Sequence, residues 1–496
     1  MDAAPIHRER GPPMFPLSEK ARRSVLNEAE RLRLLSSTER DLIRLVHEPG
    51  FPRWLEQIKS IGGCAHPIYL AGRTTTRDTL TGEVLRHYDT TEEPGGRMPV
   101  RCRNRRETRC EPCSYLHAGD TFHLVRSGLL GGKGVTDGVR HHPRLFVTLT
   151  APSFGAVHRA SVPDAGVCRP RRDGGTCEHG RPVGCGQKHA DEDSAVGQPL
   201  CRDCYDYPGH VLWHASAGAL WNRYCHMLRR HLATAAGIVQ TRLGEHLKVS
   251  FAKVAEYQRR GAAHFHAVIR VDGPEGPSSL PPLWAITDLL SDVVHSAAAS
   301  MEVHTPYSPA TGERVIRWGD QIDVHPIRSD AFIESSAFTD SAVAAYVAKY
   351  VSKSVGDAGG IDYRITDFDS IRLAQVNSHL RALMAVCWRL GGLPELEALN
   401  LRSWAHTLGF RGHVLTKSRQ YSTTYGALRA VRAEHQDEGA LLVLEERETA
   451  TESAWRYVGS GHSPAEADIA YGIAEDLANL RTIRKEIKEE WGLVNG

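Results

Sequence analysis

The chain has 496 residues and an almost balanced charge, with 61 Lys and Arg against 59 Asp and Glu. This length predicts about two to four domains. A hydrophobic content of 41% with 24% charged residues is typical of globular proteins, which excludes a mainly disordered, collagen-like or membrane-embedded chain. No apolar run approaches about 18 residues and the N-terminus has no apolar signal segment, so we expect no membrane span and a cytoplasmic protein.

The N-terminal third of the chain is predicted to change from helix to short strands. Leu, Ile and Val recur at helical spacing over 17–35 and 38–48, so residues 1–60 are expected to be helical. From 61 to 118 the composition turns to Gly, Arg, Thr and Cys, which favours short strands and loops. The alternating sequence RLFVTLTA at 144–151 then predicts a strand.

The middle of the chain alternates between loops, helices and strands. A stretch rich in Gly, Pro, Cys and His at 155–210 precedes a helix expected at 213–236. Two strand-like runs at 246–257 and 264–271 flank the turn-like sequence Arg-Arg-Gly-Ala, which predicts an antiparallel hairpin. The remaining expected elements are a helix at 284–300, a strand at 314–327, a helix at 339–354, and mostly helix beyond 360, with a last helix that Ser463 caps.

The predicted hairpin carries a candidate metal site. Side chains alternate between the two faces of a strand, so His264 and His266 point to the same side while Phe265 faces a core. Two neutral imidazoles at such positions can bind one metal ion. Across the hairpin, Glu256 is the expected third ligand and Gln258 is its nearest competitor. The alternative is a pair of structural histidines without a metal.

The helix predicted at 339–354 carries candidate nucleophiles. Tyr346, Lys349, Tyr350 and Lys353 are three or four residues apart, so their side chains are expected on one side of the helix. A phenol near an ammonium group and a divalent cation can be drawn toward phenolate, which is a nucleophile. The alternative is a core helix with two buried tyrosines, although lysines are poor core residues.

Most of the 11 cysteines lie in two clusters, at 64–113 and 168–204. In a reducing cytoplasm such clustering favours metal sites over disulfides. Each cluster contains a C-x₂-C pair with further thiols upstream, which fits a tetrahedral structural Zn²⁺. In the second cluster His189 or Cys168 could replace a ligand, and buried thiols without metal are the alternative. The expected ligands are Cys64, Cys102, Cys110 and Cys113 for one ion, and Cys177, Cys185, Cys201 and Cys204 for the other.

Arginine supplies 50 of the 61 basic residues, and its guanidinium group binds phosphate bidentately, so DNA is an expected partner. A GC-rich genome would enrich Arg as well. Six Arg lie within 97–109, and residues 399–432 combine basic side chains with aromatic ones that could stack on unpaired bases. The alternative for this second region is an aromatic core beneath a basic surface. Its aromatic residues include Trp404, Phe410, Tyr421 and Tyr425.

Three segments taken together resemble the motifs of HUH endonucleases, which include rolling-circle replication initiators, relaxases and some transposases. They are FVTLTAP at 146–152, HFH at 264–266 and YVAKYVSK at 346–353. The wider context, with GGKG at 131–134 and PLCRDCYDY at 199–207, is similar to the replication initiators of actinobacterial plasmids and integrative elements. This closer resemblance extends over nearly the whole chain.

The resemblance implies a mechanism. His264 and His266, with Glu256 or with Asp323 in its place, would hold Mg²⁺ or Mn²⁺ at the scissile phosphate. A tyrosine would attack that phosphate, leaving a 5′-phosphotyrosine and a free 3′-OH that primes rolling-circle replication, and a second tyrosine could cleave again after one round. The lysines would hold phosphate and lower the phenol pKa. The catalytic residues implied are Tyr346, Tyr350, Lys349 and Lys353.

The resemblance also implies an α+β fold in which an HUH endonuclease domain has a central antiparallel sheet of about five strands. The histidine hairpin would be central and the tyrosine helix would lie alongside, with zinc-stapled Cys-rich segments and helical N- and C-terminal regions. The expected division is an N-terminal helical region at 1–60, a Cys/Arg-rich zinc module at 61–135, the endonuclease domain at 136–360 with a zinc insertion at 155–210, and a mainly helical, candidate DNA-binding region at 361–496.

Origin DNA, as duplex and as single strand, is the expected substrate. The chain contains no G-x₄-G-K-[ST] motif, so a host helicase and polymerase are expected as partners and no membrane partner is expected. Two other functions stay open. One keeps the chemistry in a two-tyrosine HUH transposase or a relaxase, and the other is a non-catalytic zinc-knuckle DNA-binding regulator.

Overall fold

The computed structural model describes residues 35–161, 167–168, 175–328, 338–353, 355–436 and 448–490. Two compact units make up the chain: the first consists of Met1–Cys102 and Arg447–Gly496, and the second of Arg103–Glu446. The greater part of the helix predicted at 17–35 lies outside the described residues. Among the helices of the described ranges, none has the length and apolar character needed to cross a membrane.

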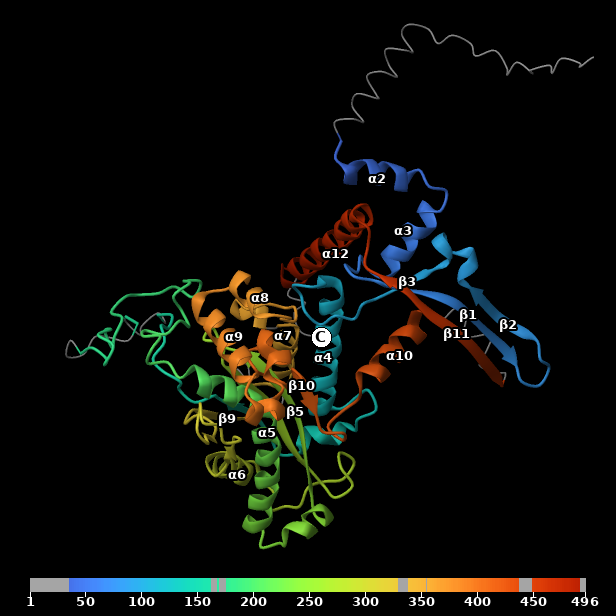
Figure 1. Cartoon of the computed structure of the whole chain (residues 1–496). Coiled ribbons are helices and arrows are strands. Elements are labelled where there is room, and N and C mark those ends of the chain that lie inside the picture. Colours follow the sequence, from blue (N-terminus) through green and yellow to red (C-terminus); the bar gives the residue numbers. More distant parts are fainter. Residues whose placement is uncertain are drawn as a thin grey trace, which may run out of the picture. The chain divides into compact units, whose positions relative to one another are not determined.

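The first unit joins the two ends of the chain in one antiparallel sheet. Strand β1 pairs with β2, β3 and β11, and Figure 1 shows β1 and β11 side by side. The last helix starts as predicted, because Ser463 and Glu466 cap it by exchanging two backbone-to-side-chain hydrogen bonds, at 2.8 and 3.3 Å. The elements are α2 (Ser37–Val46), α3 (Phe51–Ser60), β1 (Ile68–Asp78), β2 (Val84–Asp89), β3 (Met98–Val100), β11 (Thr449–Ser460) and α12 (Pro464–Glu490).

Two strands interrupt the mostly helical part of the chain beyond residue 360. Strand β11 pairs with β1 along its whole length, from Thr449 opposite Asp78 to Ser460 opposite Ile68. Nearly all β11 side chains are exposed, so the strand lacks the apolar alternation by which a sequence reveals a half-buried strand. The second strand is β10 (Leu415–Lys417), a short edge strand of the other unit.

The second unit is built on a five-stranded antiparallel sheet with the order β10-β5-β6-β4-β9, in agreement with the predicted strand number. The predicted hairpin is confirmed as β5 and β6, next to each other in the middle of the sheet. The further elements are α4 (Glu111–Leu130), β4 (Arg144–Leu149), α5 (Tyr207–Ala235), β5 (Lys248–Tyr257), β6 (Ala263–Asp272), α6 (Thr287–Ala299), β7 (Val303–His304), β8 (Val315–Ile316), β9 (Ile322–Pro326), α7 (Asp340–Ser352), α8 (Phe368–Leu373), α9 (Ser378–Leu390) and α10 (Tyr425–Gln436).

Helices cover both faces of this sheet. On one face Phe265, with Leu145 and other strand residues, packs against α5, α6 and α9 in the larger hydrophobic core. On the other face Phe146 and Val268 pack against α4 and α7 in a smaller core. The strand residues that alternate with Phe265 therefore point to the sheet face that is covered by α7, the helix that carries Tyr346.

Two predicted boundaries need correction. Residues 111–118, expected in a strand-and-loop region, begin helix α4, where Pro112 occupies the first turn. The single strand expected at 314–327 is split into β8 and β9, and between them Gly319 lies against the segment that follows β4. Its N–H donates to the carbonyl of Thr150 at 2.8 Å, and a Cβ there would come within 2.8 Å of the Ala151 carbonyl oxygen.

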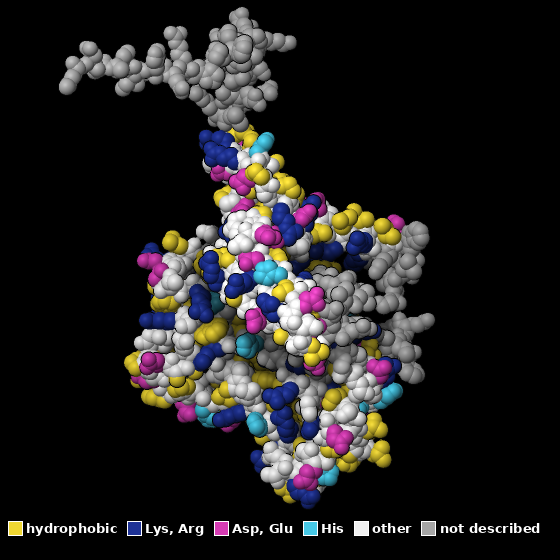
Figure 2. Space-filling view, turned by 90° about the vertical axis from the view of Figure 1, so that its right-hand side faces the viewer, with side chains coloured by type: hydrophobic (Ala, Val, Ile, Leu, Met, Phe, Trp, Pro, Cys, Tyr) yellow, Lys and Arg dark blue, Asp and Glu magenta, His cyan; other side chains and the backbone are white. Residues whose placement is uncertain are grey.

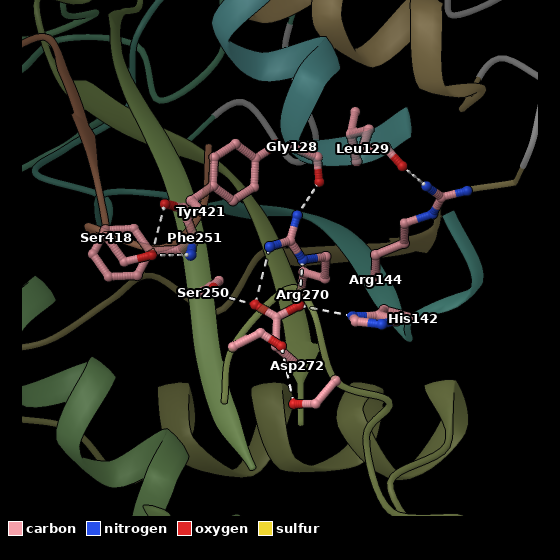
Figure 3. Close-up of polar contacts among 12 residues, drawn as sticks. Gly128, Leu129, His142, Arg144, Ser250, Phe251, Arg270, Asp272, Ser418 and Tyr421 are labelled. Atoms are coloured by element: carbon pink, nitrogen blue, oxygen red, sulfur yellow. Dashed lines mark hydrogen bonds and ion pairs between the residues drawn. The ribbon is translucent and has the colours of Figure 1, made fainter. Parts of the chain in front are cut away.

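A buried polar network ties the sheet to helix α4 (Figure 3). The Asp272 carboxylate accepts hydrogen bonds from Arg270 at 2.6 Å, from Ser250 at 2.6 Å and from His142 at 2.8 Å. Arg270 also donates to the carbonyl of Gly128 in α4. Arg270 and Asp272 are fully buried, so every partner is needed to compensate their lost hydration. The network consequently fixes α4 on the sheet face that also receives α7.

Candidate active site and metal centres

The register of the central hairpin brings the predicted metal ligands together. Glu256 in β5 lies directly opposite His264 in β6, and both point to the same face as His266. The distance from Glu256 Oε2 to His264 Nε2 is 3.1 Å and to His266 Nε2 is 2.9 Å. The two imidazole Nε2 atoms are 3.2 Å apart. A carboxylate oxygen and two imidazole nitrogens converging in this way are a donor set that fits a divalent cation.

Electrostatics keep these groups in the forms that bind a metal. Burial by itself would raise the pKa of Glu256, but its hydrogen bonds with His264 and His266 outweigh burial and bring the pKa to about 2. Burial lowers the pKa of His266, so this imidazole is neutral at pH 7. The site therefore offers an ionised carboxylate and a neutral imidazole at neutral pH.

Two other candidates for the third ligand, Asp323 and Gln258, line the pocket of about 340 Å³ that opens beside the histidines. Asp323 is not in the group of mutually close ligand atoms, and its carboxylate is 3.3 Å from the amide nitrogen of Gln321. The side-chain oxygen of Gln258 accepts a hydrogen bond from Arg260 at 2.8 Å. The geometry thus favours Glu256, and its role as a ligand stays a prediction.

Helix α7 brings the predicted nucleophiles to the same place. The hydroxyl of Tyr346 is 3.2 Å from His266 Nε2, and the ring centroid of Tyr350 is 5.9 Å from that of His266. The two tyrosine rings are 4.5 Å apart. Lys349 and Lys353 place their Nζ atoms 5.7 and 4.8 Å from the Tyr350 ring centroid. Tyr346, Lys349 and Tyr350 therefore lie close together on α7, and Lys353, the residue that follows the helix, lies beside Tyr350.

The pKa of the phenols differs in direction from the expectation. Burial raises the pKa of Tyr346, and the negative charge of Glu256 raises it further. Burial also raises the pKa of Tyr350. Both phenols thus stay protonated at neutral pH unless additional positive charge enters the site.

The position of α7 depends on contacts at both of its ends. At the start, Arg144 in β4 forms a buried ion pair with Asp340, with contacts of 2.9 and 3.1 Å. At the end, Arg105 donates to the carbonyls of Val351 at 3.0 Å and Lys353 at 2.7 Å. Arg105 belongs to the Arg-rich stretch at 97–109, so part of that stretch stabilises α7 instead of standing free for DNA.

Thr148, in the strand predicted at 144–151, has a role that the sequence did not reveal. The structure pairs Thr148 with His266 across β4 and β6, and the Thr148 hydroxyl is 2.9 Å from His266 Nδ1. This contact orients the imidazole so that Nε2 faces Glu256 and Tyr346. Because side chains alternate between the two faces of a strand, the sequence of 144–151 could have shown that Thr148 shares a sheet face with the histidines.

The N-terminal set of predicted zinc ligands is divided by the boundary between the two units. Cys64 and Cys102 belong to the first unit, where the Cys102 N–H donates to Cys64 Sγ at 3.3 Å. Cys110 and Cys113 belong to the second unit and lie at the start of α4. Binding of one ion by all four thiols stays a prediction.

The second set of predicted zinc ligands is corrected by the structure. Cys177, Cys201 and Cys204 lie together, but their fourth neighbour is His179 and not Cys185. Spacing along the chain could not show that these thiols belong to different groups. Cys185 is only eight residues from Cys177, and the structure nevertheless places the two in separate groups. Cys185 belongs to another group, which consists of His158, Cys168, Cys185 and His189. Both Cys-rich groups could hold zinc.

The aromatic residues of 399–432 mostly serve the core. Tyr421 is fully buried and Phe410 nearly so, which excludes the predicted stacking of bases on these two side chains. Trp404 and Tyr425 are half-buried. On the face drawn in Figure 2, basic and acidic side chains are interspersed, as expected from the net charge of +2. A DNA-binding surface must consequently be local.

Comparisons with known proteins agree with one another. Residues 50–475 match the family described as "Replication initiator protein, pSAM2". The chain is also 44% identical over 461 residues to a replication initiator protein of Streptomyces ambofaciens, covering 91% of this chain and 96% of that relative. No solved structure matches the chain.

Proposed function

The chain belongs to the family of pSAM2 replication initiator proteins, and from this premise we propose that it starts replication by nicking one DNA strand with a tyrosine. The observation that carries the proposal is the 3.2 Å distance between the Tyr346 hydroxyl and His266 Nε2, within a cluster of Glu256 and two histidines. A tyrosine with a purely structural role would not need to lie beside a carboxylate and two imidazoles that together suit a divalent cation.

His264, His266 and Glu256 would hold Mg²⁺ or Mn²⁺, and the donor set fits, since its three ligand atoms lie within 4.8 Å of one another. Two imidazole ligands favour Mn²⁺ at least as strongly as Mg²⁺. When bound, such a cation neutralises charge that develops on the phosphoryl oxygens. The Thr148 hydroxyl keeps the His266 imidazole in the required orientation.

The chemical step follows from the position of the phenols. Tyr346 would lose its phenolic proton, and its oxygen would form a bond to the scissile phosphorus while the bond from phosphorus to the 3′ oxygen breaks. The 3′ oxygen takes up a proton and becomes the hydroxyl that primes synthesis. The 5′ phosphate stays linked to the tyrosine, which preserves the bond for later rejoining. Because burial raises the pKa of Tyr346, positive charge near the phenol is needed for this attack.

A second nucleophile is available for the end of a replication round. Tyr350 lies one helical turn from Tyr346 with its ring 4.5 Å away, so it could cleave while the first phosphotyrosine is intact. Lys349 and Lys353 would bind the DNA phosphates around these phenols. This arrangement is that expected for a two-tyrosine HUH endonuclease in rolling-circle replication.

The proposal also names the partners. Origin DNA is the substrate, and a host helicase and polymerase, working with the initiator in the cytoplasm, would open the duplex and extend the 3′-OH. Zinc bound by Cys64, Cys102, Cys110 and Cys113 would have a structural role, because four thiolates leave no open coordination position.

The test is formation of a covalent adduct. Full-length protein is incubated with Mn²⁺ and a labelled single-stranded oligonucleotide from its own origin, and adducts that resist denaturation are separated on a gel. We expect an adduct with the parent protein and with Tyr307→Phe, an exposed tyrosine used as the control. Combining Tyr346→Phe with Tyr350→Phe should abolish the adduct. An adduct that persists in this double variant contradicts the nucleophile assignment. If the parent protein binds the origin but forms no adduct, the non-catalytic regulator is favoured.

A further inference from the structure

The segment at 155–200, between β4 and α5, lacks the means to form a hydrophobic core. It contains no Ile, Met, Phe, Tyr or Trp, and none of its Val and Leu side chains is buried among the described residues. Figure 1 draws the described part as a trace without long helices or strands. The side chains that are buried there include Cys168 and His189. A stretch of this composition folds only if another kind of bond holds it.

One group of converging side chains is His158, Cys168, Cys185 and His189, whose ligand atoms lie within 4.8 Å of one another. His158 Nδ1 is 3.2 Å and Cys185 Sγ is 3.3 Å from His189 Nε2. With metal bonds of about 2.0 Å to nitrogen and about 2.3 Å to sulfur, tetrahedral edges measure about 3.3 Å between two nitrogens, about 3.5 Å between nitrogen and sulfur, and about 3.8 Å between two sulfurs. His189 Nδ1 is 2.6 Å from the Asp193 carboxylate, so the proton lies on Nδ1 and Nε2 presents its lone pair to the group.

A second group is formed by Cys177, His179, Cys201 and Cys204, again within 4.8 Å. His179 Nδ1 is 3.3 Å from Cys204 Sγ. Cys177 lies on a tight turn in which the Gly180 N–H donates to the Cys177 carbonyl at 2.8 Å. This turn brings the first thiol and the imidazole to the same side of the chain, opposite the C-x₂-C pair at 201–204.

The order of these ligands along the chain is interleaved. The pair at 158 and 168 belongs to the first group, the pair at 177 and 179 to the second, the pair at 185 and 189 to the first, and the pair at 201 and 204 to the second. We propose that this segment is a cross-braced module that binds two zinc ions, one through two thiolates and two imidazoles and the other through three thiolates and one imidazole. Tetrahedral sets of nitrogen and sulfur are typical of structural zinc.

Interleaving makes the two ions depend on each other. Each ion closes a loop that contains one half of the other ion's ligands, so the two sites together replace the absent core. The module also contacts the hairpin that carries the histidine pair. Inside the module, the His158 N–H donates to the Gln198 carbonyl at 2.8 Å, which holds the two ends of the segment together. The adjacent Gly197 lies so close to the turn between β5 and β6 that a Cβ on it would be 2.5 Å from the Arg259 carbonyl carbon. The two ions would therefore support the hairpin that carries the histidine pair.

The first test uses the parent protein. Zinc X-ray absorption on the full-length protein should show imidazole nitrogen together with sulfur in the coordination shell. Elemental analysis should give three zinc ions per chain, two for this module and one for the four thiols at 64–113. Two four-cysteine sites would give a shell of sulfur alone. A sulfur-only shell or fewer than two ions per chain would overturn the proposal, and neither measurement depends on whether a variant folds.

The second test counts zinc in ligand variants. Combining Cys185→Ser with Cys201→Ser should lower the zinc content by two ions per chain, because these thiols serve different ions. If a single ion were bound by Cys177, Cys185, Cys201 and Cys204, the same double variant would lose only one zinc ion. His158→Ala and His179→Ala should each release zinc, and zinc retention by both would overturn the proposal. Cys225→Ala, in helix α5 and outside both groups, serves as the matched thiol control and should keep the full zinc content.

Discussion

Replacing Asp340 by Asn would test what holds the tyrosine helix on the sheet. Asp340 is in the first turn of α7 and is fully buried, and its partner Arg144 in β4 is only 4% exposed. Their contacts of 2.9 and 3.1 Å, the second of which is a hydrogen bond, form a buried ion pair between a strand and the helix that carries Tyr346. Asn keeps the size of the side chain but removes the charge that compensates the buried guanidinium group.

The magnitude follows from this burial. Breaking a buried ion pair by removing one partner costs about 3–5 kcal/mol of unfolding free energy, because the remaining charge is left in a medium of low polarity. Asn can still accept one hydrogen bond, so we expect about 3 kcal/mol for Asp340→Asn, which is about a hundredfold change in the unfolding equilibrium. Asp288 is the matched control, since it is also in the first turn of a helix, α6, but is exposed. Its replacement by Asn should cost at most about 1 kcal/mol.

Urea unfolding followed by tryptophan fluorescence measures both variants. The free energy difference should appear in the transition of the second unit, which contains the Arg144–Asp340 pair. Joint replacement of Arg144 by Met and Asp340 by Leu should recover part of the loss, because no uncompensated charge stays buried. If Asp340→Asn and Asp288→Asn cost the same, the ion pair does not hold α7, and the placement of the tyrosines needs another cause.

Three further outcomes are expected. Gly128→Ala should destabilise the protein by about 1–3 kcal/mol in thermal unfolding, because the new Cβ would be 2.3 Å from the Tyr421 ring. Gly119→Ala on the same helix meets nothing within 4 Å and should stabilise by up to about 1 kcal/mol, and destabilisation of both would contradict the steric cause. Thr148→Val should weaken Mn²⁺ binding about 10–100-fold in calorimetry, because His266 loses its 2.9 Å partner, and unchanged affinity would exclude an orienting role. Burial holds the folded pKa of His266 below its usual 6.5, so protonation of this ligand should weaken Mn²⁺ binding only below about pH 6.5. As the pH falls, the unfolded state protonates the His266 imidazole at a higher pH than the folded state does. His266 therefore also lowers the free energy of unfolding as the pH drops below about 6.5. An affinity that already declines between pH 8 and 7 would contradict this assignment.

Local periodicity was enough to predict the core of the candidate site. Alternation along β6 places His264 and His266 on one face, and the short turn before them sets the register that brings Glu256 opposite. Helical spacing likewise predicts that Tyr346 and Tyr350 share a face. These relations concern residues close in the chain, and the backbone geometry of a strand or helix determines them almost alone.

Relations between distant segments could not be predicted in this way. The partition of the zinc ligands depends on where chain turns direct each thiol, so Cys185 joined His158 and not its sequence neighbour Cys177. The segment that contains Tyr421 and Phe410 has the basic and aromatic composition of a base-stacking surface. Only the burial of these two side chains shows that they belong to the core.

The sequence by itself determined which side chains are available for metal binding and nucleophilic attack, and on which face of its own strand or helix each one lies. Only the tertiary structure decided that the face of β6 and the face of α7 meet, with the Tyr346 hydroxyl 3.2 Å from His266. The physical reason is that this meeting depends on contacts between residues far apart in the chain, such as the Arg144–Asp340 pair, whose members are 196 residues apart. The local sequence around either residue does not identify its partner.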